Sequence, residues 1–175
     1  MKTKLSNPLA VISMFLVTIS FLTNTVAQEK SKKELKEERA LEKQKQIALL
    51  VDSKEFIFEA TRVLSLDGKI IYLTSNYIAE FHPHFIKCDL PFFGRAYSGV
   101  GYGGDGGIKF EGKPTVYSVE KKKKNFLIKA DVRGQHDSYS IMLSIYFDGS
   151  AYLTINSNNR SYISYDGDIK YFNKK

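Results

Sequence analysis

The sequence predicts a mostly β protein, an antiparallel meander that forms a small barrel or sandwich and follows one N-terminal helix. From residue 54 onward, apolar and polar residues alternate with a period of two, which is typical of strands that bury one face. Four Asp-Gly pairs punctuate this region, and Asp-Gly is a preferred sequence for tight hairpin turns. The segment before it contains no Gly or Pro and is rich in helix-forming Glu, Lys and Leu.

Residues 1–27 have the three-part pattern of a secretory signal peptide. A basic start with Lys2 and Lys4 precedes an apolar run of 14 residues, which is short for a bilayer-spanning helix of about 20. Thr25 and Ala27 then occupy the −3 and −1 positions of a cleavage site. We therefore expect an exported protein, periplasmic or secreted, that is cleaved after Ala27.

The mature chain, residues 28–175, has a length suited to one domain with one hydrophobic core. It holds 24 basic against 19 acidic side chains, a net charge of +5 that favours anionic surfaces only weakly. No second apolar stretch is long enough to span a membrane, and export argues against nucleic acid as a partner. Cys88 is the only cysteine, so no intramolecular disulfide forms, and we expect a buried thiol.

Residues 28–53 are predicted to form a charged helix or tether. Apolar positions are sparse at its start and gather at its end, at Ile47 and at 49–51. We expect a solvated first part and a last part that docks on the β domain, residues 54–175. A partner-binding coiled coil would need sustained heptads, which the segment lacks.

The alternation defines about eight to ten short strands. In residues 139–147 the apolar side chains share one face, and Ser140 and Ser144 lie opposite. Residues 121–125 and 157–161 are predicted hairpin connections. The Asp-Gly pairs predict four further turns, at Asp67-Gly68, Asp105-Gly106, Asp148-Gly149 and Asp166-Gly167.

The glycine-rich segment 94–107 contains the spacing G-x-G-x-x-G at residues 99–104. A dinucleotide site needs a helix that begins inside this motif, and the β-type sequence after it excludes one. A calcium loop needs several oxygen ligands at alternate positions, and the segment offers only Asp105. The simplest interpretation is a structural crossover.

The same segment is also our candidate ligand rim. Glycines allow close backbone approach, and tyrosines offer a flat contact surface with a polar tip. The candidate residues are Arg95, Tyr97, Tyr102 and Asp105.

Catalytic and metal signals are weak. His82, His84 and Cys88 would share a face on an unbroken strand, but Pro83 interrupts it and the paired spacings of zinc sites are absent. No nucleophile elbow is present, and the Asp-Gly carboxylates are explained by turns. We expect no cofactor, no metal ion and no assigned catalytic residue.

Several stretches resemble an uncharacterised family of exported Bacteroidota proteins, the domain of unknown function that is four-two-five-one in its series. The most specific are "LPFFGRAY", "YGGDGGIKF" and "SYDG". The resemblance covers about residues 40–172 and implies a compact, mostly β domain in a Gram-negative envelope. It implies no activity, cofactor or catalytic residue.

We therefore predict a non-enzymatic binding or envelope-interaction module. Its expected partner is a small apolar ligand, a glycan or an envelope protein. A structural or inhibitor-like interaction domain and a hydrolase of unrecognised type stay open as alternatives.

Overall fold

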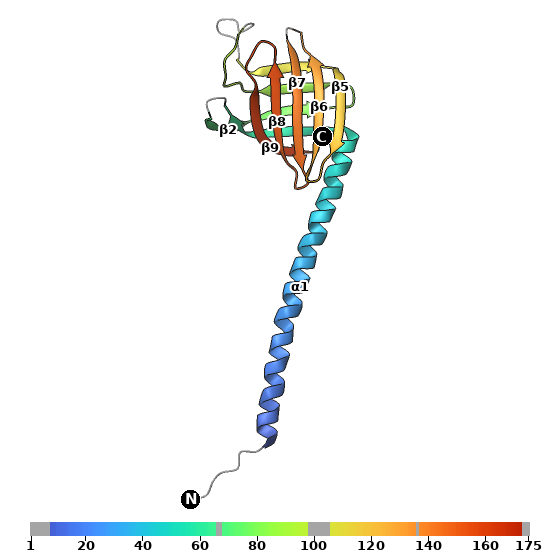
Figure 1. Ribbon diagram of the computed structural model, residues 1–175, viewed down its shortest axis with the longest axis vertical. Helices are drawn as coiled ribbons and strands as arrows, with labels where there is room; N and C mark the ends of the chain where they lie inside the picture. The colour runs from blue at the N-terminus through green and yellow to red at the C-terminus, as the bar shows by residue number, and fades with distance from the viewer. Residues whose placement is uncertain (1–7, 66–67, 98–105, 136, 173–175) are drawn as a thin grey trace, which may run out of the picture. The chain divides into compact units, whose positions relative to one another are not determined.

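The computed structural model of the chain describes residues 8–65, 68–97, 106–135 and 137–172, with side chains from residue 31 onward (Figure 1). The chain divides into two compact units, residues 1–42 and 43–175. Helix α1 (Pro8–Ser53) runs through the first unit and contributes its last turns to the second. All side chains from residue 31 to residue 42 are exposed, which fits a charged, solvated helix. Among the described residues, no helix is both long and apolar enough to cross a membrane.

In the part of the chain that the structure describes, nine strands follow the helix, within the predicted number. They are β1 (Phe56–Leu64), β2 (Ile70–Phe81), β3 (Ile86–Leu90), β4 (Ile108–Gly112), β5 (Pro114–Lys121), β6 (Asn125–Arg133), β7 (Ser138–Tyr146), β8 (Ser150–Ser157) and β9 (Ile163–Lys170).

All nine strands belong to one antiparallel sheet in the order β4-β3-β2-β1-β9-β8-β7-β6-β5. In Figure 1, β5 to β9 run side by side, and β1 to β4 cross behind them. Strands β1 and β9, far apart in the chain, pair along their length and join the two halves. The prediction of a mostly β, antiparallel fold after one helix is confirmed, and the sheet curls into a nearly closed barrel.

The two ends of the sheet, β4 and β5, meet in sequence at Lys113. Because every neighbouring pair is antiparallel, β4 and β5 run in the same direction and form two halves of one bent strand. The bend brings Gly112 against β6, where a Cβ atom would lie 2.7 Å from the Arg133 carbonyl oxygen. A glycine is required here because the corner leaves no room for a side chain.

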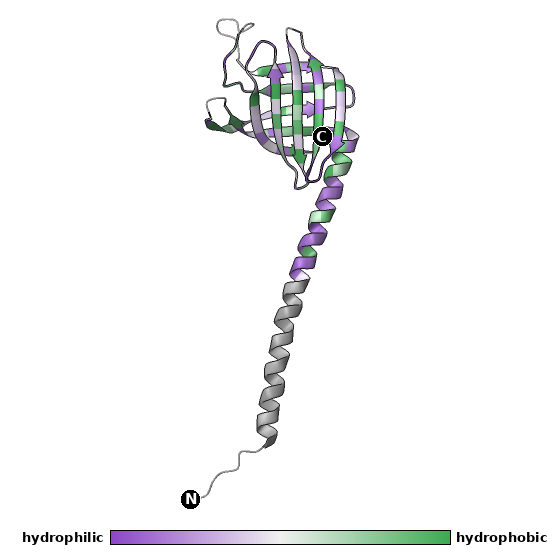
Figure 2. Ribbon diagram, in the orientation of Figure 1, coloured by the Kyte–Doolittle hydropathy of each residue, from purple (hydrophilic) through white to green (hydrophobic). Residues whose placement is uncertain are grey.

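The interior of the barrel is filled by its own side chains. In most of the strands, buried apolar residues alternate with more exposed ones, a pattern that Figure 2 shows as alternating colours along the strands. The Phe56 and Phe81 rings stack with centroids 4.7 Å apart. Ile47, Leu50 and Val51 from the end of α1 are buried in the same core, which confirms that the last turns dock on the β domain.

The turn predictions have mixed outcomes. Gly149 has a φ of 89° in the connection between β7 and β8, as a tight turn requires. Gly68 also has a positive φ, whereas Asp67 and Asp105 lie outside the described residues.

The predicted turn at Asp166-Gly167 is wrong, because both residues lie inside β9. A Cβ atom on Gly167 would lie 2.0 Å from the Glu59 carbonyl oxygen of β1. The glycine therefore permits close approach of two strands rather than a reversal of the chain.

Candidate functional site

The described part of the predicted rim lies along the connection between β8 and β9. The Tyr97 backbone N–H donates to the Asn159 carbonyl oxygen at 2.8 Å, and the Ser161 N–H donates to the Arg95 carbonyl oxygen at 2.9 Å. The Arg95 and Tyr97 side chains are exposed there, Tyr97 by 70%. Tyr102 and Asp105 lie outside the described residues, so the rim prediction stays a prediction.

A cleft of about 480 Å³ adjoins this segment, and we call it the rim cleft. One wall comes from β3 and β4, and the other from the connections β6–β7 and β8–β9. Since β4 is the end strand of the sheet, the cleft lies where the barrel is not closed by hydrogen-bonded strands. The lining residues include Asn159 and Arg160, which pair with the predicted rim, but neither Arg95 nor Tyr97.

At one end of the rim cleft, Arg160 connects two segments that are distant in the sequence. Its Nη1 atom donates to the carbonyl oxygens of Gly106 and Gly107 at 2.6 and 2.7 Å. Its guanidinium carbon lies 5.3 Å from the centre of the Phe92 ring, within range of a cation–π interaction. The single side chain therefore ties the start of β4 to the segment after β3.

At the other end of the rim cleft, Asp137 connects two segments through hydrogen bonds. Its carboxylate accepts hydrogen bonds from the Ser138 N–H at 2.7 Å, from the Asn158 N–H at 3.1 Å and from the Ser157 hydroxyl. These bonds connect the β6–β7 connection to the end of β8. The walls of the rim cleft are thus fixed in the free protein, and preorganised walls reduce the entropy lost on binding.

The base of the rim cleft is aromatic. The rings of Phe110 from β4 and Tyr139 from β7 stack at 4.2 Å, although their strands do not pair. Burial, followed by the Asp137 charge, raises the pKa of Tyr139 above its ordinary value. The tyrosine is therefore neutral, and its hydroxyl serves as a hydrogen-bonding group rather than as an anion.

The charges around the rim cleft balance. Among the described residues that line it, three side chains are basic and three are acidic, and Lys109 and Asp89 form an ion pair at 3.3 Å. Such a surface favours a polar ligand with charges of both signs over an apolar molecule or a polyanion. The members are Lys87, Lys109 and Arg160, with Asp89, Glu111 and Asp137.

The weak metal-like cluster is dispersed. His82 stacks against Phe85 and Phe172, and its Nε2 atom lies 3.3 Å from a Glu80 carboxylate oxygen. Cys88 faces the core, and its burial raises the pKa of the thiol. In the described ranges, no three His, Cys, Asp or Glu side chains lie close enough to hold a metal ion.

Sequence reasoning did not identify Arg160 or Asp137 as site residues. Both lie in connections, and the two carbonyl groups that Arg160 binds are 53 and 54 residues away in the chain. A lone arginine in a polar connection gives no local signal of such a long-range role.

Comparison with known proteins agrees with this fold. Residues 38–169 match the family described as "Domain of unknown function (DUF4251)". The chain is also similar to the crystal structure of a DUF4251 family protein from Bacteroides eggerthii DSM 20697, with 21% sequence identity and a TM-score of 0.59. That match covers 76% of this chain and 90% of the other, and at this identity it shows the shared fold alone. No curated protein matches the chain.

Proposed function

Starting from the fact that the chain belongs to the DUF4251 family, we propose that it is an exported, non-enzymatic binding module of the cell envelope. Its ligand site is the rim cleft, and the ligand class is a polar molecule with charges of both signs, such as an extended peptide. The observation that carries the proposal is the rim cleft itself, with its balanced charges and aromatic base.

A binding role is favoured over catalysis by the state of the reactive side chains. The Cys88 thiol is buried with a raised pKa, so it does not supply a nucleophilic thiolate. His82 is held between two phenylalanine rings, away from the rim cleft lining. The side chains that do line the rim cleft recognise ligands through hydrogen bonds and ion pairs.

Amide mapping would test the ligand site. The probe is a tetrapeptide that contains one lysine and one glutamate, titrated into the isotope-labelled chain. We expect shifts at the amides of 109–111 and of Gly134, Gln135 and Asp137. Gln135→Trp, which adds bulk to an exposed residue of the rim cleft, should remove them.

The control is Lys123→Trp, which places the same indole side chain in the β5–β6 connection, outside the rim cleft lining. This variant should keep the shifts. Shifts that avoid the rim cleft, or that survive Gln135→Trp, would contradict the proposed site.

Export has its own test. The sequence of the first 27 residues supports cleavage after Ala27, so the chain purified from the periplasm or medium of an expressing Gram-negative host should begin at Gln28. A chain that keeps Met1 and stays in the cytoplasm would refute export without bearing on the rim cleft.

A further inference from the structure

The outer face of the β7–β8 pair carries no charged residue. Nine side chains point outward from the two strands, and eight of them end in a hydroxyl or an amide. We call this surface the hydroxyl face. Its members are Ser138, Ser140, Met142, Ser144, Tyr146, Ser150, Tyr152, Thr154 and Asn156.

The absence of charge is local to this pair of strands. The chain as a whole is 26% charged. On one side, β6 places Lys129 and Asp131 opposite Met142 and Ser140. On the other side, β9 places Asp166 opposite Tyr152. The hydroxyl face is therefore an uncharged strip with charged borders, and general polarity of the sheet does not account for it.

The strip is long and hollowed at both ends. Along β7 it extends from Ser138 to Tyr146, about 27 Å at the usual strand rise. A hollow of about 440 Å³ at one end is lined by Ser138, Ser140 and Asn156 of the strip, and by the charged Asp131 and Arg133 of β6 at its border.

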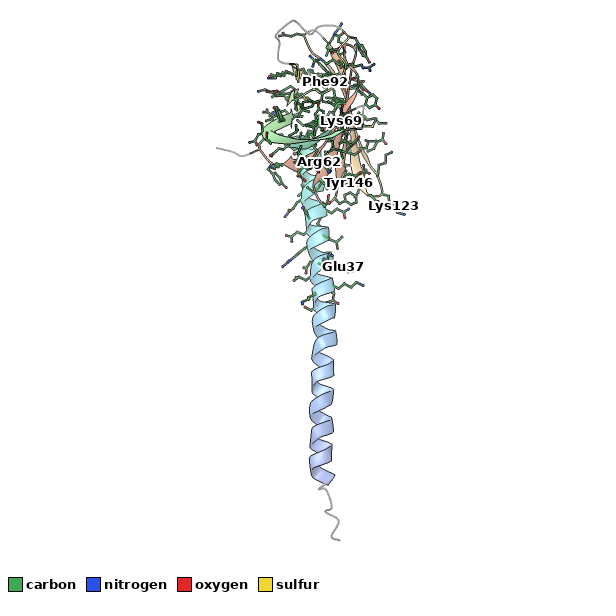
Figure 3. The ribbon with its side chains drawn as sticks, turned by 90° about the vertical axis from the view of Figure 1, so that its left-hand side faces the viewer. Glu37, Arg62, Lys69, Phe92, Lys123 and Tyr146 are labelled. Atoms are coloured by element: carbon green, nitrogen blue, oxygen red, sulfur yellow. The ribbon has the colours of Figure 1, made fainter. Side chains whose placement is uncertain are left out.

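A second hollow, of about 480 Å³, lies at the other end. Tyr146 and Ser150 line it with Tyr72 and with Arg62, which is paired to Asp166 at 2.8 Å. Figure 3 labels Arg62 and Tyr146 next to each other on the barrel, and both line this hollow. An elongated ligand can thus lie along the strip and enter a depression at each end.

From this geometry we propose that the hydroxyl face binds a neutral polysaccharide. A hydroxyl group both donates and accepts hydrogen bonds, as does an amide, so these side chains match sugar hydroxyls in either direction. Binding here desolvates no unpaired charge of the strip. The tyrosine rings supply flat apolar surface for the C–H faces of sugar rings, with a polar tip at the edge. Tyr139 lines both the rim cleft and the hollow near Ser138, but none of the nine side chains of the hydroxyl face lines the rim cleft, so either site can fail without the other.

The composition argues against a protein as the occupant. The cores of protein–protein interfaces are rich in aromatic residues and methionine and depleted in serine. The hydroxyl face has four serines, and its one methionine, Met142, and two tyrosines, Tyr146 and Tyr152, are separated by hydroxyl side chains rather than gathered in an apolar cluster. A stable interface needs a buried apolar centre, and this strip does not offer one.

Affinity gels would test the proposal. The full chain, purified from an expressing host, is run through native gels that contain dextran, soluble starch or a mixed-linkage β-glucan. A gel with polygalacturonate, a polyanion, serves as the control, because it measures the retardation that the positive net charge of the chain produces. We expect at least one neutral polymer to retard the chain.

Two tyrosine variants connect the retardation to the face. Tyr146→Ala removes a 45%-exposed ring from the strip and should weaken binding about fivefold. Tyr162→Ala removes a 55%-exposed ring outside it and should change binding less than twofold. Thermal unfolding of both variants checks that each is folded.

Three outcomes would overturn the proposal. One is that none of the three neutral polymers retards the chain. Another is that both tyrosine variants lose retardation equally. The third is a dimer in solution that Met142→Glu dissociates, which would assign the strip to a contact between copies of this chain.

Discussion

Two strand pairs of the same barrel, β3–β4 and β7–β8, have the same kind of inner face and opposite outer faces. Both bury apolar side chains at alternate positions. On the outside, all four outward residues of β3–β4 are charged, and each lies opposite a residue of the other sign, Lys87 opposite Glu111 and Asp89 opposite Lys109. The nine outward residues of β7–β8 include no charge.

The comparison shows that folding determines the composition of the inner face of the sheet but not that of the outer face. The inner face must be apolar wherever the sheet closes on the core. The outer face needs only to be compatible with water, and charges or hydroxyls both satisfy that requirement. A long strip that avoids charge in a charged protein therefore indicates a surface selected for contact with something neutral.

The largest expected effects come from the shared inner faces. Leu143→Ala in β7 and Ile108→Ala in β4 should each lower the free energy of unfolding by about 2–5 kcal/mol, since both side chains are buried. Urea unfolding measures the change. If only one of the two substitutions lowered the unfolding free energy, the inner faces of the two strand pairs would not belong to one core.

Arg160→Ala should have the next largest effect. It removes two charged hydrogen bonds and the contact with Phe92, for a loss of about 1–3 kcal/mol in unfolding free energy. Arg160→Lys keeps the charge but not the planar group, so it should recover only part of the loss in the same urea experiment. Full recovery by lysine would show that charge alone anchors this end.

Tyr117 of β5 gives a pH-dependent prediction. Burial raises the pKa of Tyr117 to about 12, and its hydroxyl has no hydrogen-bond partner among the described residues. The folded state therefore loses stability as pH rises from about 10 to 12, because only the unfolded chain ionises readily there. Tyr117→Phe should remove about 1 kcal/mol of this alkaline loss and leave stability at pH 7 unchanged or slightly higher.

Thermal unfolding across pH 7 to 11.5 would check the Tyr117 prediction. Equal alkaline losses in Tyr117→Phe and in the unsubstituted chain would contradict it. The other buried tyrosines contribute to both curves alike.

The smallest effects on stability should come from the outer faces. Lys109→Ser breaks an exposed ion pair, and Ser140→Glu adds a charge to the hydroxyl face; each should change unfolding free energy by less than about 1 kcal/mol. A large loss in either variant would show that the outer composition serves folding after all.

The sequence predicted the parts of this fold that depend on local pattern. Period-two alternation identifies the inner face, and the Asp148-Gly149 pair identifies a turn. The same dipeptide at Asp166-Gly167 misled, because glycine serves both turns and close strand contacts, and only the position of β1 distinguishes the two.

The candidate sites depend on contacts between distant segments. The rim cleft needs the β4–β5 bend and the reach of Arg160, neither of which has a local signature. The predicted rim pairs with residues of the rim cleft, although Arg95 and Tyr97 do not line it. Ser140 and Ser144 were visible as an outer face in the sequence, but the full strip emerges only when β7 and β8 pair in register.

The most direct test of the account is to give the hydroxyl face the outer surface of β3–β4. Met142 and Thr154 lie opposite each other, so Met142→Glu with Thr154→Lys creates a cross-strand charge pair like that of Asp89 and Lys109. We predict that this double variant stays folded, with a loss of at most about 2 kcal/mol in unfolding free energy because Thr154 also hydrogen-bonds to the buried Ser164, and that it loses its retardation in neutral polysaccharide gels. Undiminished retardation in the folded double variant would contradict the account.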